Sequence, residues 1–323
     1  MGRLTIILVH FLLILSAIDA DQLDCQHCKD GIANTYISIQ GKPYHETCYR
    51  DHIQPRCDHC GKPIEKKFIT FEAENYHEAC YRNHVLIKCA ICTEPLEGRY
   101  YTDFWENSFH ATHADELPEC NTCGRLICES LTQGGYTLGD GRFLCSICNE
   151  TAVRSDFLLG SSLDYVRNLL QSHGINNLPT EIPITLVDRL ELKRLASSYS
   201  DAMNGFTQHH IQTQNGTILS RESHIYILDH LPLTMFKAVL AHELLHVYLF
   251  ERDLSLPSHI GEGFCNLGSA LVYQDIPSDY AKFRLENMHA SQDPDYGIGY
   301  RNMDALLQQR GWRYLLATLD QLQ

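Results

Sequence analysis

The chain has 323 residues, enough for two or three folding units, and a formal net charge of −14 from 40 acidic and 26 basic residues. This charge repels a phosphate backbone and no basic cluster offsets it, which excludes nucleic acid as a partner. Thirteen of the fourteen cysteines precede residue 150. The chain therefore divides into a cysteine-rich first half and a second half with the composition of an ordinary globular domain.

The first twenty residues have the layout of a secretory signal peptide. Arg3 precedes an apolar run, Leu4–Leu15, and small residues that end in Ala20. The run is too short to span a bilayer, so we expect residues 1–20 to be removed and the mature protein to be secreted with no membrane span. The alternatives are an uncleaved anchor, or an intracellular protein if this segment is not used.

A unit of about 32 residues is repeated four times from residue 25 to residue 148, and each unit opens with a C-x-x-C pair. Each unit closes with two further histidines or cysteines, so it offers the four donors that tetrahedral zinc requires. We therefore expect about four structural zinc ions. The predicted ligands are Cys25, Cys28, His45 and Cys48; Cys57, Cys60, His77 and Cys80; Cys89, Cys92, His110 and His113; and Cys120, Cys123, Cys145 and Cys148.

The alternating side-chain pattern of residues 36–39 and 68–71 predicts short hairpins. Such hairpins are too small to fold without a bound metal or another cross-link. Zinc binding, at about 10 kcal/mol per site, would supply that stability. A disulfide framework is the alternative, because a signal peptide makes disulfides reasonable. Disulfides do not explain histidines at ligand spacing, however, and the third unit closes with His110 and His113 in place of sulfur. Cys128 falls outside the pattern and is expected to be a spare thiol or half of a local pair.

Tandem C-x2-C-x16-H-x2-C units resemble LIM domains, the paired zinc fingers that bind other proteins. Eight residues separate Cys48 from Cys57 and Cys80 from Cys89, whereas a typical LIM domain has two residues between its fingers. We therefore describe residues 25–148 as a LIM-like array. All its ligand sets are complete, so we expect it to bind a protein partner or to support the catalytic domain rather than to perform chemistry.

Residues 232–252 carry apolar side chains at helix spacing and contain the motif HELLH at residues 242–246. Two histidines four residues apart lie on one helix face and can bind one zinc, with Glu243 beside the open coordination position. Glu243 would take the proton of the zinc-bound water as that water attacks a carbonyl. The motif predicts a catalytic zinc, and the alternative is a buried helix with two hydrogen-bonded histidines.

The third zinc ligand decides the class of peptidase. A metzincin would have glycine at position 249 and histidine at position 252, but these residues are leucine and arginine. Glu262 lies sixteen residues after His246 and opens a second helix-like apolar stretch that runs to residue 273. A carboxylate from a following helix completes the His2Glu site of a gluzincin, so we predict His242, His246 and Glu262 as ligands. His259 is the rival for the third position.

Residues 224–228 read as a strand upstream of the catalytic helix. We expect it to be an edge strand beside that helix, where a peptide substrate could add a further strand. The predicted fold class is therefore α+β: an array of small β-hairpin zinc fingers, a linker near residues 150–160, and a gluzincin-like peptidase domain over residues 160–323.

Four strings in the chain carry a family resemblance: Asp140-Gly141-Arg142-Phe143-Leu144-Cys145, Leu240-Ala241-His242-Glu243-Leu244-Leu245-His246, Glu262-Gly263-Phe264-Cys265 and Tyr296-Gly297-Ile298-Gly299-Tyr300-Arg301. From about Cys89 to the end, the chain resembles the LIM-domain peptidases that restrict organ growth in plants, the DA-one family. The resemblance implies a zinc peptidase that cleaves proteins at internal bonds. It also implies His242, His246 and Glu262 on the metal and Glu243 as the base.

Tyr296 and Tyr300 are candidates for the group that stabilises the oxyanion, because a phenol can donate a hydrogen bond there. The alternative is that both tyrosines pack in a C-terminal helical subdomain. For the whole chain we expect a secreted zinc metallopeptidase that acts on a protein or peptide substrate. The alternative is a non-catalytic scaffold whose zinc array binds partners.

Overall fold

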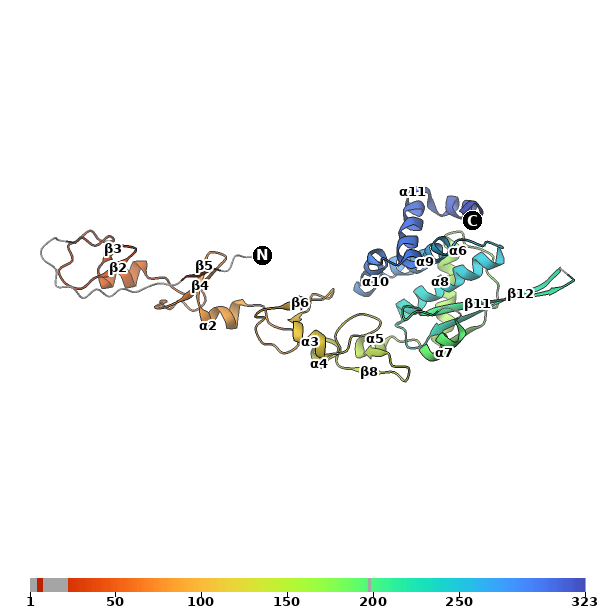
Figure 1. Cartoon of the computed structure of the whole chain (residues 1–323), viewed down its shortest axis with the longest axis horizontal. Coiled ribbons are helices and arrows are strands. Elements are labelled where there is room, and N and C mark those ends of the chain that lie inside the picture. Colours follow the sequence, from red (N-terminus) through yellow and green to blue (C-terminus); the bar gives the residue numbers. More distant parts are fainter. Residues whose placement is uncertain (1–4, 8–22, 197–198, 216, 323) are drawn as a thin grey trace. The chain divides into compact units, whose positions relative to one another are not determined.

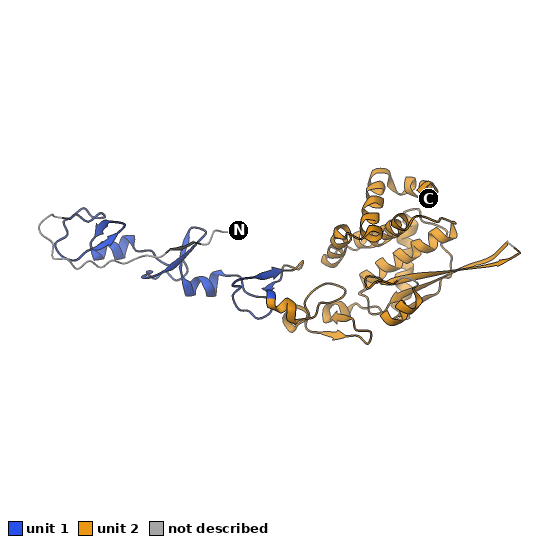
Figure 2. Ribbon diagram, viewed as in Figure 1, with its two compact units in different colours: residues 1–102, 107–111 blue, residues 103–106, 112–323 orange. Residues whose placement is uncertain are grey.

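The computed structural model describes residues 5–7, 23–196, 199–215 and 217–322 (Figure 1). The chain forms two compact units (Figure 2). The first, here called the finger unit, comprises residues 1–102 and 107–111, and the C-terminal unit comprises residues 103–106 and 112–323. The division falls within the third repeat, so the predicted linker near residues 150–160 coincides with no boundary between the units.

The finger unit consists of short antiparallel hairpins. Their strands are β2 (Ile37–Ile39) with β3 (Lys42–Tyr44), β4 (Phe68–Phe71) with β5 (Glu74–His77), and β6 (Tyr100–Thr102) with β7 (Ser108–His110). The short helices α1 (Glu46–Cys48) and α2 (Glu78–Cys80) follow the first two hairpins and continue into the helical turns η1 (Tyr49–Ile53) and η2 (Tyr81–Val85). The predicted hairpins are therefore confirmed.

The N-terminal segment that we predicted as a signal peptide contributes one described strand, β1 (Thr5–Ile7), which pairs antiparallel with β4. The rest of residues 1–20 lies outside the described residues. The second finger has only a small apolar core, formed by Cys57, Ile64, Phe68, Tyr76 and Tyr81. A core of this size agrees with the expectation that metal binding stabilises the fingers.

The fourth repeat belongs to the C-terminal unit. The helix α3 (Ala111–Glu116) leads into it, and it contains α4 (Glu129–Thr132), the antiparallel strands β8 (Gly135–Thr137) and β9 (Phe143–Cys145), and α5 (Ser146–Glu150).

Buried polar contacts hold the fourth repeat in this unit. Arg142 is 4% exposed, forms ion pairs with Asp140 and Asp229, and donates to the Asp229 carbonyl at 2.8 Å. Asp140 also accepts the backbone N–H of Arg189 at 2.8 Å, and the Val153 N–H donates to the Leu231 carbonyl at 2.9 Å. The fourth finger is thus built into the C-terminal unit, because its buried charged residues have their partners there.

The C-terminal unit contains a three-stranded sheet in the order β10 (Ile184–Val187), β12 (Thr217–Leu228) and β11 (Gly205–Gln214). β10 runs parallel to β12, and β11 is antiparallel to it. Figure 1 shows β11 and β12 as one long hairpin. Residues 224–228 therefore lie in the central strand, and the expectation of an edge strand there was wrong. Both sides of β12 are already paired, so β10 and β11 are the edge strands.

Two long helices carry the candidate catalytic residues. α8 (Leu233–Glu251) and α9 (Ser258–Asp275) coincide with the two helical stretches expected from apolar spacing. They approach closely at Gly268, where a β-carbon would lie 3.0 Å from the Ala241 carbonyl oxygen. This close contact brings the ligand-bearing faces of the two helices together.

The helix α8 is long and apolar enough to cross a membrane by length and composition alone, although no span was expected after signal removal. In the structure, 67% of its apolar window is buried. Its apolar side chains, including Phe236, Leu240 and Leu244, belong to the main hydrophobic core. A buried core helix accounts for the same composition.

The remaining helices surround this core. They are α6 (Asp156–Ser172), α7 (Arg189–Leu195), α10 (Asp279–Ala290), η3 (Pro294–Gly299), α11 (Tyr300–Thr318) and η4 (Leu319–Leu322). The mixture of helices, a small sheet and antiparallel hairpins agrees with the predicted α+β class.

Candidate functional site

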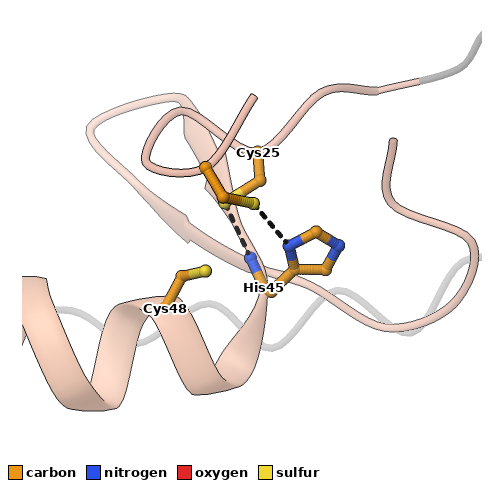
Figure 3. Close-up of side chains that lie close together, drawn as sticks. Cys25, His45 and Cys48 are labelled. Atoms are coloured by element: carbon orange, nitrogen blue, oxygen red, sulfur yellow. Dashed lines mark hydrogen bonds between the residues drawn. The ribbon is translucent and has the colours of Figure 1, made fainter. Parts of the chain in front are cut away.

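The predicted finger ligands converge in the structure. In the first, second and fourth quartets, the potential ligand atoms lie within 4.8 Å of one another. Figure 3 shows Cys25, His45 and Cys48 of the first quartet turned toward each other. In the third quartet, Cys89, Cys92 and His110 meet this limit within the finger unit, and His113 follows on α3.

Backbone N–H groups prepare the first cysteine of each of the first three quartets to bind a metal. Burial of Cys25 opposes ionisation, but N–H donors, including that of His45 at 3.4 Å, lower the pKa of its thiol to about 6. The pKa values of Cys57 and Cys89 are also lowered to about 6 by the same type of contact. Because the thiolate is the form that binds metal, these environments suit zinc at neutral pH.

The fourth quartet contains four cysteines, and all of them are buried. The Sγ atoms of Cys123 and Cys145 lie 3.7 Å apart. All fourteen cysteines, which fall within the described residues, are free thiols. This weighs against the disulfide framework. Cys128 lies outside the quartets, with its sulfur 3.4 Å from the Ser130 hydroxyl.

The second type of candidate site joins α8 and α9. The Nε2 atoms of His242 and His246 lie 3.1 Å apart, and Oε2 of Glu262 lies 3.2 Å and 3.5 Å from them. His259, the rival third ligand, is exposed and does not belong to this group.

A hydrogen-bond chain fixes the tautomer of His242. The Asn266 amide donates through Nδ2 to the Tyr296 carbonyl at 2.8 Å, so its Oδ1 is free to accept. His242 Nδ1 lies 3.0 Å from this oxygen and must carry the proton. The lone pair of His242 Nε2 is consequently available on the side where His246 and Glu262 meet.

This donor set fits a zinc ion. Oε2 of Glu262 is buried and has no hydrogen-bond partner, which is costly unless a cation or donor satisfies it. Burial opposes ionisation of Glu262, but the close approach of His242 and His246 outweighs that effect and holds its pKa well below the usual range. Two imidazoles and one carboxylate leave a fourth position open, as catalytic zinc sites do.

Glu243 lies beside this group and is 4% exposed. Its Oε2 accepts a hydrogen bond from the Thr207 hydroxyl at 2.7 Å. Burial raises the pKa of Glu243 to about 7, although His246 and the Thr207 hydroxyl oppose the shift. A carboxyl group with this pKa can take up and release a proton near neutral pH.

A cavity of about 550 Å³ contains the site. It is lined by Glu243 and Glu262, and by Tyr296, whose ring stacks on His242 with the centroids 6.2 Å apart. Tyr300 is fully buried, with its hydroxyl 3.3 Å from His289 Nε2, and is absent from the cavity lining. Of the two tyrosines, only Tyr296 thus faces the cavity.

Sequence reasoning missed three groups that shape the site: Thr207, Asn266 and His209. Asn266 follows Glu262 by four residues on α9, so the helix period could have identified it. Thr207 and His209 line the cavity from β11. Their sequence carries no local signal, because β11 meets the helix α8 only through the tertiary fold.

Comparison with known proteins agrees with this arrangement. Residues 25–84 match the LIM domain family. The chain is 26% identical over 292 residues to protein DA1-related 2 of Arabidopsis thaliana, and this match covers 79% of this chain and 49% of that protein. It is 27% identical over 228 residues to LIM domain-containing protein HDR3 of Oryza sativa subsp. japonica, covering 58% of this chain and 43% of that protein. It is 25% identical over 280 residues to protein DA1 of Arabidopsis thaliana, and this match covers 75% of this chain and 46% of that protein.

These matches confirm the resemblance to LIM-domain proteins of the DA1 type, and the LIM domain indicates zinc. The match begins at Cys25 and takes in the first two repeats, so the eight-residue spacing between fingers is compatible with a LIM domain. The chain spans about half the length of the curated relatives it matches.

Proposed function

For a chain that carries a LIM domain and is similar to DA1 and DA1-related proteins, we propose that the C-terminal unit is a gluzincin-type zinc peptidase that hydrolyses peptide bonds in proteins. The observation that carries the proposal is the convergence of His242, His246 and Glu262, with Glu243 beside them in a cavity. Three protein ligands with an adjacent carboxylate are the requirement for metal-assisted hydrolysis.

His242, His246 and Glu262 would hold the metal. When bound, zinc would supply Lewis-acid polarisation of the peptide carbonyl and acidify a water molecule. Asn266 keeps His242 in the tautomer that offers Nε2.

Glu243 would act as the general base and then as the general acid. The Thr207 hydroxyl holds Oε2 of this carboxylate, which would take a proton from the attacking water. The carboxyl group would then return that proton to the leaving nitrogen, which suits a group whose pKa burial raises to about 7.

Tyr296 is the better candidate for stabilising the oxyanion. Burial, together with Glu262 and Glu243, raises the pKa of its phenol, so the phenol stays protonated and can donate a hydrogen bond. Tyr300 already contacts His289 and has no access to the cavity lining.

The test is cleavage of casein by the wild-type protein and by Glu243→Gln. We expect the variant to keep its zinc and its fold but to lose turnover, because a neutral amide cannot accept the proton. Equal cleavage by the two proteins would rule out Glu243 as the base.

A second function follows from the LIM domain, since such domains mediate protein–protein interaction. We propose that residues 25–148 bind a protein partner. If the chain were only a scaffold, no turnover would be found, and Glu243→Gln would leave partner binding unchanged.

We further propose that the protein is secreted. Arg3 and the apolar run Leu4–Leu15 support this, as does the small residue Ala20. When the full chain is expressed in a secreting eukaryotic cell, the protein should be recovered from the culture medium. Its N-terminus, determined by sequencing, should lie near residue 21. Retention in the cytosol with an intact N-terminus would contradict it.

A further inference from the structure

The catalytic cavity contains an arginine that has no counter-ion. Arg284 lies on α10 and lines the same cavity as Glu243 and Glu262. Its Nε atom is buried without a hydrogen-bond partner. Among the described residues, no carboxylate forms an ion pair with its guanidinium, and no lysine or other arginine lines this cavity.

The groups that raise the pKa of Arg284 are phenols. Burial alone would lower the pKa of the guanidinium, but Tyr273 and Tyr280 outweigh this and raise it. The side chain is therefore charged throughout the range in which a peptidase works. A buried charge that forms no ion pair is costly, unless a ligand of opposite charge occupies the space beside it.

The same face of α10 and the residue after its end also line this cavity. Asn287, Met288 and Ser291 follow Arg284 by three, four and seven residues, which is the spacing of one helix face, and all line the cavity. The zinc ligands and Glu243 come from α8 and α9. A peptide held at Glu243 would thus meet a separate wall of the cavity that carries one positive charge.

We propose that Arg284 is a substrate-binding residue that receives a carboxylate of the peptide near the scissile bond. The planar guanidinium matches a carboxylate with two parallel hydrogen bonds, and a buried site strengthens them. The carboxylate would come from an acidic side chain of the substrate or from its C-terminus. This proposal rests on the proposed peptidase function, and it deepens that function by assigning a substrate class.

The experiment measures peptide binding without turnover. Zinc-loaded Glu243→Gln protein is titrated with fluorescent peptides that carry Glu or Gln at single positions along one common sequence. Each peptide is made with a free and with an amidated C-terminus. The same titrations are repeated in the double variants with Arg284→Gln, with Arg284→Lys, and with Arg313→Gln as an exposed arginine control.

We expect a carboxylate to strengthen binding about tenfold or more, as hydrogen bonds between charged groups do. Sensitivity to Glu versus Gln would identify a side chain, and sensitivity to amidation would identify the C-terminus. Arg284→Gln should abolish the preference, Arg284→Lys should reduce it severalfold, and Arg313→Gln should leave it intact. If Arg284→Gln does not fold, the Lys variant makes the same comparison with the charge retained.

Two outcomes would overturn the proposal: no preference for a carboxylate at any position, or a preference that persists without Arg284. Casein cleavage by the wild type distinguishes a failure of the Arg284 proposal from a failure of the proposed peptidase function. Cleavage without carboxylate preference would remove only the role of Arg284. Carboxylate-selective binding without cleavage would remove the peptidase and leave the carboxylate site.

Discussion

A β-carbon on Gly205 would lie 2.6 Å from Oε1 of Glu243 and 3.0 Å from its Cδ. The strand β11 therefore meets the helix α8 where only a hydrogen atom fits. Thr207, two residues further along the same strand, holds the other oxygen of the same carboxyl group at 2.7 Å. One short segment of strand thus sets the position of the proposed base.

Gly205→Ala should reduce kcat/KM by about 100-fold, because a displacement of about 1 Å in a catalytic group has an effect of that order. Zinc content should stay the same, since the metal ligands lie on α8 and α9. Gly160→Ala is the matched control, because a β-carbon at Gly160 meets nothing within 4 Å. Full activity in Gly205→Ala would show that this close contact does not position Glu243.

Asn266→Ala should weaken binding of the catalytic zinc about 10- to 100-fold, as loss of a group that orients a metal-binding histidine does. The physical reason is that His242 Nδ1 would lose the oxygen that fixes its tautomer. Competition with a chromogenic chelator measures the affinity. Asn266→Asp keeps an acceptor and should bind zinc at least as tightly as the wild type; equal affinities for Asn266→Ala and wild type would contradict the argument.

Thr207→Val should move the acid limb of the kcat/KM profile to higher pH. Glu243 must be ionised to accept a proton, so activity rises as the pH passes through its pKa. The Thr207 hydroxyl favours the ionised form and lowers that pKa, so its removal should raise the pKa. Thr207→Ser keeps the hydroxyl and should leave the profile in place; a limb shifted to lower pH in Thr207→Val would contradict this account.

Chelation of zinc should unfold the fingers of the finger unit before the helical core. Each finger has few buried apolar residues, and zinc contributes about 10 kcal/mol per site in such modules. The core around α8 and α9 is large and should retain its helices. Hydrogen exchange measured with and without chelator shows which segments lose their protection. Thiol titration of the chelated, denatured protein should count all fourteen cysteines, and a count lower by two or more would indicate disulfides.

Local patterns in the sequence predicted what short-range geometry determines. Apolar spacing predicted α8 and α9, and the i, i+4 spacing placed His242 and His246 on one face. The repeat of 32 residues predicted the ligand quartets that the structure brings together.

Contacts between segments that are distant in the sequence could not be predicted from such local patterns. The pairing of β12 with both β10 and β11 depends on the whole sheet, so residues 224–228 were placed wrongly at an edge. The attachment of the fourth finger depends on Arg142 and Asp229, which are 87 residues apart. Thr207 and Glu243 are likewise 36 residues apart and meet only in the folded unit.

The most direct test of the zinc peptidase measures the zinc content of the wild type and of the double variant His242→Ala/His246→Ala by mass spectrometry, with casein cleavage measured on the same samples. Four finger quartets and one catalytic group predict five zinc ions per chain in the wild type. The variant should hold one fewer and should not cleave casein. An unchanged zinc count, or cleavage that survives the substitutions, would contradict the catalytic site described here.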